Sequence, residues 1–378
     1  MRFPKFSGEW KREILNDVCT FHNGRAYKQN ELLSDGKYRV LRVGNFFTND
    51  SWYYSDLELD DEKVAVNGDL LYAWSASFGP RFWTGEKVIY HYHVWKIDSF
   101  QQVSKEFLFY FLERDTEKIK NEVQGGTMVH ITKGDMEKRE ILYPSILEQS
   151  KIARLLSLLD ERIATQNKII EKLQSLIKGI VDELMTVLLK GKLYPFSSFY
   201  IKAGEGGTPT TSVNEYYLGG TIPFIKIEDL SCKYLTSSKD FITELGMQKS
   251  SAWLIPSHSV IYSNGATIGA ISINEYPICT KQGILGIVPN TNINVEYLYL
   301  LMSSSYFSKE VNRIVTEGTM KTAYLKDINH IKCPLPSMAQ QQNITNLTSS
   351  IEKKLFVEQE LLKLLNIQKQ HLLRTMFI

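Results

Sequence analysis

The sequence has few cysteines, no long apolar run and almost no excess of charge. Its four cysteines lie far apart and form no CxxC pair, which predicts free thiols in a reducing cytosol. No apolar run is long enough to cross a membrane, and residues 1–10 lack the apolar core of a signal peptide, so we expect a cytoplasmic protein. Residues 1–147 hold 20 basic and 22 acidic side chains, and residues 192–336 hold 12 and 11. This balance argues against a general polyanion binder but allows a local basic patch.

Recurrent catalytic motifs are also absent. The chain has no GxxxxGK[ST], GxSxG or HExxH, which excludes the P-loop NTPase, the nucleophile-elbow hydrolase and the HExxH metalloprotease. A GxGxxG begins at Gly204, but Pro209 stands where its last glycine belongs. His91 and His93 form an HxH that a strand would place on one face, and without nearby Cys or carboxylate ligands we interpret it as structural. We therefore expect no catalysis, metal or cofactor in this chain itself.

What the chain does contain is an internal repeat. Residues 126–152 and 318–344 align without a gap at an offset of 192, with eight identities in 27 columns where chance predicts about one or two. Upstream, residues 68–79 match 257–269 and residues 40–43 match 224–227, in the same order. The repeat predicts two modules of one design that have diverged in their loops.

Each copy is predicted to form a module followed by one long helix. Short apolar runs bounded by Gly, Asn, Asp or Pro predict strands at 38–43, 69–74, 87–95, 222–227 and 259–263. Helical stretches are predicted at 105–114 and 295–303. The predicted division is a first module at 1–144, a first helix at 145–190, a second module at 191–336 and a second helix at 337–378.

The two long segments carry apolar heptads. Ser145 with Glu148, and Ser337 with Gln340, predict a capping box at the start of each helix. Apolar residues then recur at spacings of four and three, the pattern of a coiled-coil seam. The predicted seam comprises Ile152, Leu156, Leu159, Ile163, Gln166, Ile170, Leu173, Ile177, Ile180 and Leu184 in the first helix and Ile344, Thr348, Ile351, Leu355, Glu358, Leu362, Leu365, Lys369, Leu372 and Met376 in the second.

A helix with such a stripe needs a partner to cover it, and the other helix is the nearest candidate. We expect the two helices to pack antiparallel, which would place one module at each end of a rod about 60 Å long. Gln166 and Glu358 occupy the same seam position and would either set the register or be tolerated at an exposed position. The expected fold class is α+β, with two similar mixed α/β domains and an antiparallel coiled coil.

The layout resembles the specificity subunit of type I restriction–modification systems over nearly the whole chain. The features that carry the resemblance are Trp10 with Leu-Asn-Asp-Val at 15–18, Gly-Asp-Leu-Leu at 68–71, Gly-Gly-Thr-Pro at 206–209, the paired Gly-Thr-Met segments, and Pro-Ser-x-x-(Glu/Gln)-Gln entering each long helix. The sequence departs from the family pattern at 73–77 and 263–267, where recognition loops are expected to vary.

The resemblance implies a non-catalytic DNA reader. Each target-recognition domain would read half of an asymmetric bipartite sequence through the major groove, and the helices would set the unspecified spacer. Two modification subunits would dock on the helical region and carry S-adenosylmethionine and the adenine methylation. Restriction subunits would add an ATP- and Mg-dependent translocating nuclease. The alternative is a coiled-coil adaptor that holds two protein-binding modules.

Candidate DNA contacts are polar, cationic or Gly-adjacent residues near the ends of predicted strands, and many of them align between the copies. Arg42 aligns with Lys226, and 74–77 align with 264–267, whereas Arg81, Lys281 and Gln282 have no support from the repeat. The full set is Arg42, Asn45, Trp74, Ser75, Ser77, Arg81, Thr127, Met128, His130, Lys226, Asp229, Asn264, Gly265, Thr267, Lys281, Gln282, Thr319, Met320 and Lys321. We expect helix faces at 148–189 and 340–376 to dock the modification subunits, through a mainly polar contact.

Overall fold

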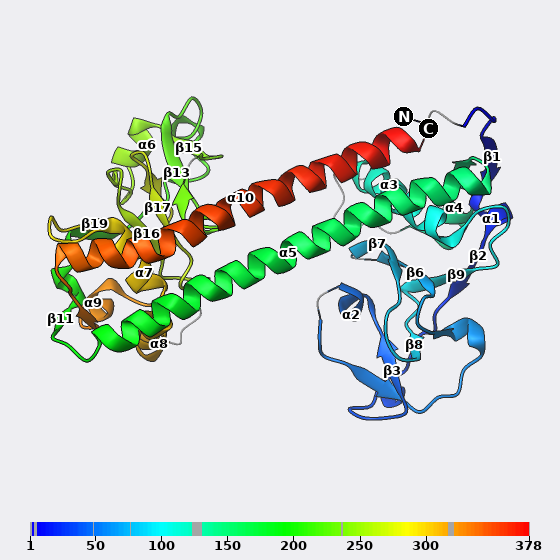
Figure 1. Ribbon diagram of the computed structural model, residues 1–378, viewed down its shortest axis with the longest axis horizontal. Coiled ribbons are helices and arrows are strands. Elements are labelled where there is room, and N and C mark those ends of the chain that lie inside the picture. The colour runs from blue at the N-terminus through cyan, green and yellow to red at the C-terminus, as the bar shows by residue number, and fades with distance from the viewer. Residues whose placement is uncertain are drawn as a thin grey trace. The chain divides into compact units, whose positions relative to one another are not determined.

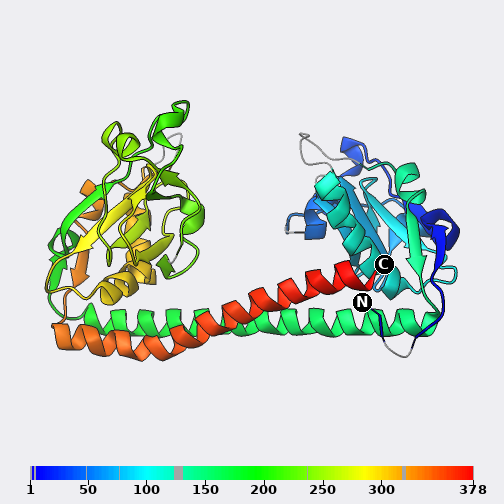
Figure 2. The same ribbon diagram turned by 90° about the horizontal axis from the view of Figure 1, so that it is seen from above.

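The chain divides into two units, Met1–Asn167 with Glu360–Ile378, and Lys168–Gln359. The computed structural model describes residues 2–3, 6–47, 49–75, 77–122, 131–235, 237–316 and 321–377. Each unit holds one module and a part of each long helix, α5 (Ile146–Leu188) and α10 (Met338–Met376). Figures 1 and 2 show these two helices side by side. Among the described residues, no helix is both long and apolar enough to span a bilayer.

The module of unit 1 is built on two four-stranded sheets. One has the order β2-β9-β6-β7 and is antiparallel, and the other has the order β4-β3-β8-β5, in which β3 and β8 run parallel. A separate antiparallel pair joins β1 to β10. The strands are β1 (Lys11–Ile14), β2 (Thr20–Asn23), β3 (Tyr38–Leu41), β4 (Tyr53–Ser55), β5 (Val64–Ala65), β6 (Leu70–Ser75), β7 (Ser77–Phe82), β8 (Val88–Tyr90), β9 (Val94–Asp98) and β10 (Glu140–Tyr143). The helices are α1 (Leu15–Val18), α2 (Val43–Phe47), α3 (Lys105–Glu122) and α4 (Lys133–Glu137), with 3-10 turns η1 (Gln29–Glu31) and η2 (Asp61–Lys63).

The module of unit 2 repeats most of this topology, with β14 added to the edge of one sheet and the other sheet reduced to three strands. Its sheets have the orders β12-β19-β16-β17-β14 and β15-β13-β18, with β13 and β18 parallel, and β11 pairs with β20. The strands are β11 (Leu193–Pro195), β12 (Tyr200–Glu205), β13 (Ile222–Ile225), β14 (Tyr234–Leu235), β15 (Phe241–Ile242), β16 (Val260–Ser263), β17 (Ile271–Asn274), β18 (Cys279–Thr280), β19 (Ile284–Pro289) and β20 (Lys332–Pro334). The helices are α6 (Glu244–Gln248), α7 (Val295–Ser303), α8 (Ser305–Ile314) and α9 (Leu325–Ile328), with turns η3 (Phe196–Ser198), η4 (Asn214–Tyr216) and η5 (Ile227–Asp229). The predicted internal duplication and α+β fold are thus confirmed.

One predicted strand is wrong. The apolar run 87–95 forms two strands, β8 and β9, because residues 91–93 turn between them. His91 and His93 therefore do not share the face of a strand. Arg42 and Lys226 also lie just after strands β3 and β13, whereas the sequence places them inside strands.

The long helices pack antiparallel within each unit. In unit 1 the start of α5 and the end of α10 share one core, in which Ile152 and Leu156 lie with Leu373 and Met376. In unit 2 the end of α5 and the start of α10 share another, in which Val181 and Met185 lie with Ile344. Every predicted seam residue is buried or half-buried, and the equivalent polar pair Gln166 and Glu358 are 5% and 6% exposed.

The start of each long helix is fixed to its module by a buried polar side chain. Gln149 and Gln341 are both fully buried. The Gln149 amide donates to the carbonyls of Gln102 and Pro144 at 2.9 Å each. Gln340 accepts from the Ser337 backbone at 3.0 Å, which confirms the capping box of α10. The boundaries between modules and helices inferred from the sequence remain predictions.

Candidate nucleic-acid interface

In unit 1, the ends of two parallel strands bring a cation and a turn together. Arg42 is exposed and follows the last residue of β3. The backbone N–H of His91 donates to the Leu41 carbonyl at 2.9 Å, because β8 ends beside β3. The N–H of Trp74, at the end of β6, donates to the His93 carbonyl at 3.1 Å. The turn 91–93 is therefore tied to both sheets.

Unit 2 reproduces the same arrangement with different side chains. Lys226 follows β13, and the N–H of Lys281 donates to the Ile225 carbonyl at 2.9 Å. The N–H of Asn264 donates to the Gly283 carbonyl at 3.0 Å. We call these residues the strand-end corner of each unit, which comprises Arg42, Trp74 and 91–93 in unit 1 and Lys226, Asn264 and 281–283 in unit 2.

A glycine allows a neighbouring strand to reach each corner. A Cβ at Gly24 would lie 2.3 Å from the His91 carbonyl oxygen, and a Cβ at Gly206 would lie 2.1 Å from that of Thr280. Both distances are far below van der Waals contact, so only glycine fits at either position. Gly206 belongs to the Gly-Gly-Thr-Pro segment noted in the sequence, and this contact gives that motif a physical reason.

The cation at each corner is restrained by the strand beside it. The Arg42 guanidinium lies 5.0 Å from the centre of the Tyr53 ring. Lys226 Nζ lies 2.8 Å from Asp240 Oδ2. Tyr53 and Asp240 occupy equivalent places, because β4 and β15 each pair antiparallel with the strand that precedes the cation. The Lys226–Asp240 pair is partly exposed, so it orients the lysine without contributing much stability.

The sequence missed residues 91–93 as candidates for DNA contact. Lys281 and Gln282, which lacked support from the repeat, have His91 and Tyr92 as structural counterparts. The two turns correspond at an offset of 190 residues, because Val94 and Ile284 begin the strands that follow them. The alignment did not show this correspondence because the turn sequences, His-Tyr-His and Lys-Gln-Gly, share no residue.

Aromatic rings surround the corner of unit 1. Trp74 lies 5.0 Å from His93 and 6.2 Å from Tyr92 between ring centres, and His91 lies 4.9 Å from His93. The pKa of His91 is lowered to about 4, mainly by burial and then by the nearby His93 and Arg42. This ring is therefore neutral at pH 7. Within the described residues, no group of three His, Cys, Asp or Glu side chains is placed to hold a metal ion.

Several candidates are buried in the framework of the loops. Ser75 and Asn264 are 7% and 1% exposed, and Gly265 is also buried. The Asn264 amide donates to the Ala323 carbonyl at 3.1 Å, and the Ala323 N–H donates back to the Asn264 carbonyl at 2.8 Å. Burial favours a role for these three residues in holding the loops, while Thr267 is exposed on the same loop.

Two further candidates, Asn45 and Asp229, also form hydrogen bonds with the backbone. Asn45 donates from its amide to two carbonyls of the loop that follows α2, at 2.9 and 2.7 Å. The Asp229 carboxylate accepts from the Lys226 N–H at 2.8 Å and so closes η5. These contacts fix the backbone on which the corner cations stand, and direct DNA contact by either residue stays a prediction.

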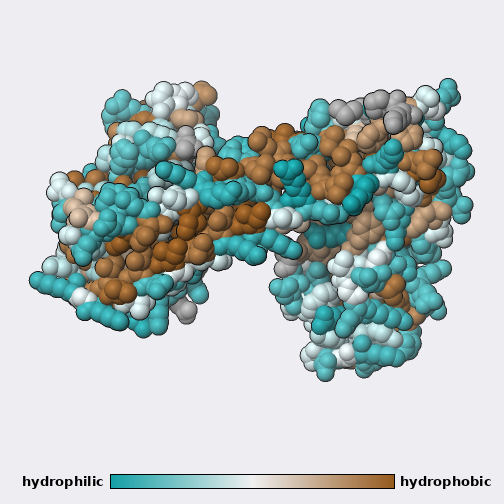
Figure 3. Space-filling model, in the orientation of Figure 1, coloured by the Kyte–Doolittle hydropathy of each residue, from teal (hydrophilic) through white to brown (hydrophobic). Residues whose placement is uncertain are grey.

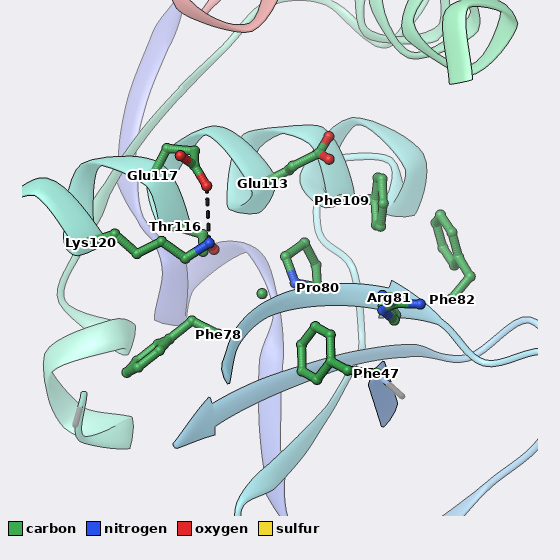
Figure 4. Close-up of a pocket in the computed structure, with 11 residues that line it drawn as sticks. Phe47, Phe78, Pro80, Arg81, Phe82, Phe109, Glu113, Thr116, Glu117 and Lys120 are labelled. Carbon is green, nitrogen blue, oxygen red and sulfur yellow. Dashed lines mark hydrogen bonds and ion pairs between the residues drawn. The ribbon is translucent and has the colours of Figure 1, made fainter. Parts of the chain in front are cut away.

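Arg81 lies on the wall of a pocket of 390 Å³ between β7 and α3 (Figure 4). Its guanidinium lies 4.9 Å from the centre of the Phe47 ring, which joins the pocket to α2.

Two other candidates can be placed in the structure: Lys321 is exposed, and Ser77 begins β7. The remaining candidates lie outside the described residues: Thr127, Met128, His130, Thr319 and Met320. The residues on either side of Thr319 and Met320 pair with each other, since the Thr316 N–H donates to the Thr322 carbonyl at 3.2 Å.

Comparison with known proteins gives the family. The family model described as type I restriction modification DNA specificity domain matches residues 7–175 and again 200–366. The MjaVIII specificity subunit of Methanocaldococcus jannaschii is 23% identical over 95% of this chain and 89% of its own length. The MjaIX subunit of the same organism is 30% identical, but the match covers 38% of this chain and 34% of that subunit. The EcoR124I/EcoR124II specificity subunit of Escherichia coli is 30% identical over 39% of this chain and 37% of its own length.

Solved structures show the same fold. The specificity subunit of a type I system from M. genitalium aligns with a TM-score of 0.56 at 18% identity, over 100% of this chain and 99% of that one. A chain from a structural study of complex assembly and conformational transition of the type I system aligns with a TM-score of 0.52 at 15% identity, over 99% and 98%. The chain therefore belongs to the family of type I restriction–modification DNA specificity subunits, which are themselves non-catalytic, and is a component of such a complex.

Proposed function

We propose that each unit reads one half of an asymmetric bipartite DNA target, and that the paired helices set the spacer between the halves. The observation that supports this most directly is the strand-end corner, which both units build on one hydrogen-bond framework. One framework with different side chains suits two readers of different half-sequences. The corner cations, Arg42 exposed and Lys226 half-buried, would contact phosphates or base edges, and neighbouring polar groups would supply further donors.

The test is a methylome of cells that express this chain with its modification and restriction partners. We expect one bipartite motif with a fixed spacer. Replacing residues 192–336 with the module of another specificity subunit should change one half of the motif only. A change in both halves, or in neither, would contradict the assignment of one module to each half. The same experiment separates this function from the coiled-coil adaptor, which would give no DNA motif at all.

We further propose that the exposed faces of α5 and α10 dock the modification subunits. The sequence predicts a mainly polar contact. Apolar side chains also gather along both helices on the face seen in Figure 3, which supports a contact with an apolar part. Leu155 and Leu347 are equivalent residues of the repeat and are 36% and 57% exposed. Leu176 and Phe356 add further exposed apolar area in unit 2, at 51% and 62%. Exposed apolar surface of this kind is typical of a partner contact.

Docking can be tested by charge substitution. Leu347→Asp should weaken the binding of a modification subunit to the chain by about tenfold or more, because it places a carboxylate in an apolar contact. Gln248→Asp, at an exposed position of α6 and so off both long helices, is the control and should leave binding unchanged. Native mass spectrometry of the complex measures both. Equal loss in the two variants would point to a general effect of charge.

The partner subunits would supply what this chain lacks. In this proposal the modification subunits bind S-adenosylmethionine and the restriction subunits bind ATP and Mg²⁺, and the complex works in the cytoplasm. Because neither module carries a strong net positive charge, the isolated chain should bind DNA weakly until the modification subunits dock. Tight sequence-specific binding by the isolated chain at physiological salt would contradict this.

A further inference from the structure

The turns at 91–93 and 281–283 combine a fixed backbone with variable side chains. At one end of each turn, its first N–H donates to the last residue of the strand that precedes the corner cation. At the other end, its last carbonyl is bonded to the N–H of Trp74 or Asn264. With both ends tied in the same way, the two turns present their side chains from equivalent places.

The segments that contain Gly24 and Gly206 add further backbone hydrogen bonds to each turn or to the residue before it. The Arg25 N–H donates to the Tyr90 carbonyl at 3.0 Å, and the Gly207 N–H donates to the Thr280 carbonyl at 3.0 Å. Tyr92 in turn donates its N–H to the Arg25 carbonyl at 3.1 Å. A backbone held in this way loses little further freedom on binding, which favours specific recognition.

The side chains at the two tips are exposed and chemically different. Tyr92 is 39% exposed, with Trp74 and two imidazoles against it. Lys281 and Gln282 are both exposed. Lysine and glutamine carry the donors that match guanine and adenine edges in the major groove, whereas aromatic rings offer apolar contact to the thymine methyl group. The duplicated framework thus carries an aromatic tip in one unit and an amine–amide tip in the other.

We infer that these two turns are the specificity-determining elements of their units, with Tyr92 reading bases in one half-site and Lys281 and Gln282 reading purines in the other. This inference rests on the proposed function and narrows it to named residues. Arg42 and Lys226, one on each corner, position the turn on the duplex through the phosphates. The turns set which bases are preferred, and the cations set how tightly any duplex is held.

The experiment uses the full chain in complex with its modification subunits. A duplex library randomised over both half-sites is selected for retention by the wild type, by Tyr92→Ala and by Gln282→Ala. Tyr92→Ala should reduce discrimination at one or two positions of one half-site by about 5- to 150-fold, and Gln282→Ala should do the same in the other half-site only. Tyr92→Phe, which removes only the hydroxyl, checks that any loss with alanine does not come from misfolding.

Two controls match these variants. Val66→Ala changes an exposed side chain of unit 1, and Gln248→Ala changes an exposed glutamine of unit 2. Both should select the wild-type motif. Arg42→Gln should weaken retention of all sequences alike and leave the preferred bases unchanged.

The outcomes separate the inference from the function on which it rests. A wild-type complex that selects no bipartite motif would contradict the proposed function. A wild type that selects one, with Tyr92→Ala and Gln282→Ala both keeping its discrimination at every position, would overturn the inference alone. Loss of discrimination in both half-sites by a single variant would also overturn it, because each turn would then fail to act within its own half.

Discussion

The side-chain carbonyl of Gln341 accepts a hydrogen bond from the backbone N–H of Asn294 at 2.7 Å. The same amide donates to the carbonyls of Asn292 and Pro336 at 3.0 and 2.9 Å. One fully buried glutamine thus joins the first turns of α10 to the segment before α7. Gln149 makes the matching three bonds in unit 1, including one from the Ser104 N–H at 2.8 Å.

Gln341→Ala should lower the stability of unit 2 by about 2–4 kcal/mol, because it leaves buried backbone groups without partners. Gln341→Glu should be similarly harmful at pH 7, since a carboxylate would face two carbonyl oxygens. Gln368→Ala, on the exposed part of the same helix, is the control. Thermal unfolding and hydrogen exchange at the α7 N-terminus measure the effect. A harmless Gln341→Ala would show that water replaces the side chain at no cost.

Gly206→Ala should destabilise unit 2 by about 3 kcal/mol, because its Cβ would overlap the Thr280 carbonyl and push β12 away from β18. Gly179 offers a matched control on α5, where nothing lies within 4 Å of an added Cβ. Gly179→Ala should stabilise the helix by about 0.5–1 kcal/mol. Urea unfolding of both variants gives the comparison, and equal effects of the same sign would refute the steric argument.

Lys369→Met should be strongly destabilising in unit 1. Lys369 Nζ lies 2.7 Å from both Glu113 Oε1 and Asp160 Oδ1, and its side chain is 13% exposed. Burial raises the pKa of Glu113, so removing the lysine would leave that carboxyl buried without its cation. A loss of about 3–5 kcal/mol is expected.

The partner substitution tests whether the loss comes from the unpaired charge. Lys369→Met combined with Glu113→Leu should recover part of the stability, because no buried carboxylate remains at that position. Differential scanning calorimetry of the single and double variants gives the coupling. Strictly additive effects would mean that the two residues do not interact energetically.

His91 should make unit 1 less stable in mild acid. Its pKa is lowered from 6.5 to about 4 in the folded chain, so between these values the unfolded state binds a proton that the folded state does not. Stability from this group is therefore complete above about pH 6.5 and is lost as the pH falls toward 4. His91→Phe cannot titrate, and its melting temperature should fall less than that of the wild type between pH 7 and pH 5.

The control for this pH dependence is His371→Phe, at an exposed position of α10. It should follow the wild type across the same range. An NMR titration in which the His91 ring protonates near pH 6.5 would contradict the burial argument directly.

The sequence by itself determined the duplication, the antiparallel helices and the lack of recurrent catalytic motifs. These are carried by local periodicity and by repeated residues such as Pro144 and Pro336, so no knowledge of the contacts is needed. Arg42 and Lys226 were likewise found by alignment alone.

Only the tertiary structure decided which side chains share a corner. The bonds from His91 to Leu41 and from Lys281 to Ile225 join backbone groups far apart in the chain, and backbone pairing leaves no mark on side-chain identity. Burial was equally hidden, because Asn264 reads as a polar loop residue until Ala323 is placed against its amide. The turns could diverge completely in sequence while keeping one backbone, and for that reason the alignment did not find them.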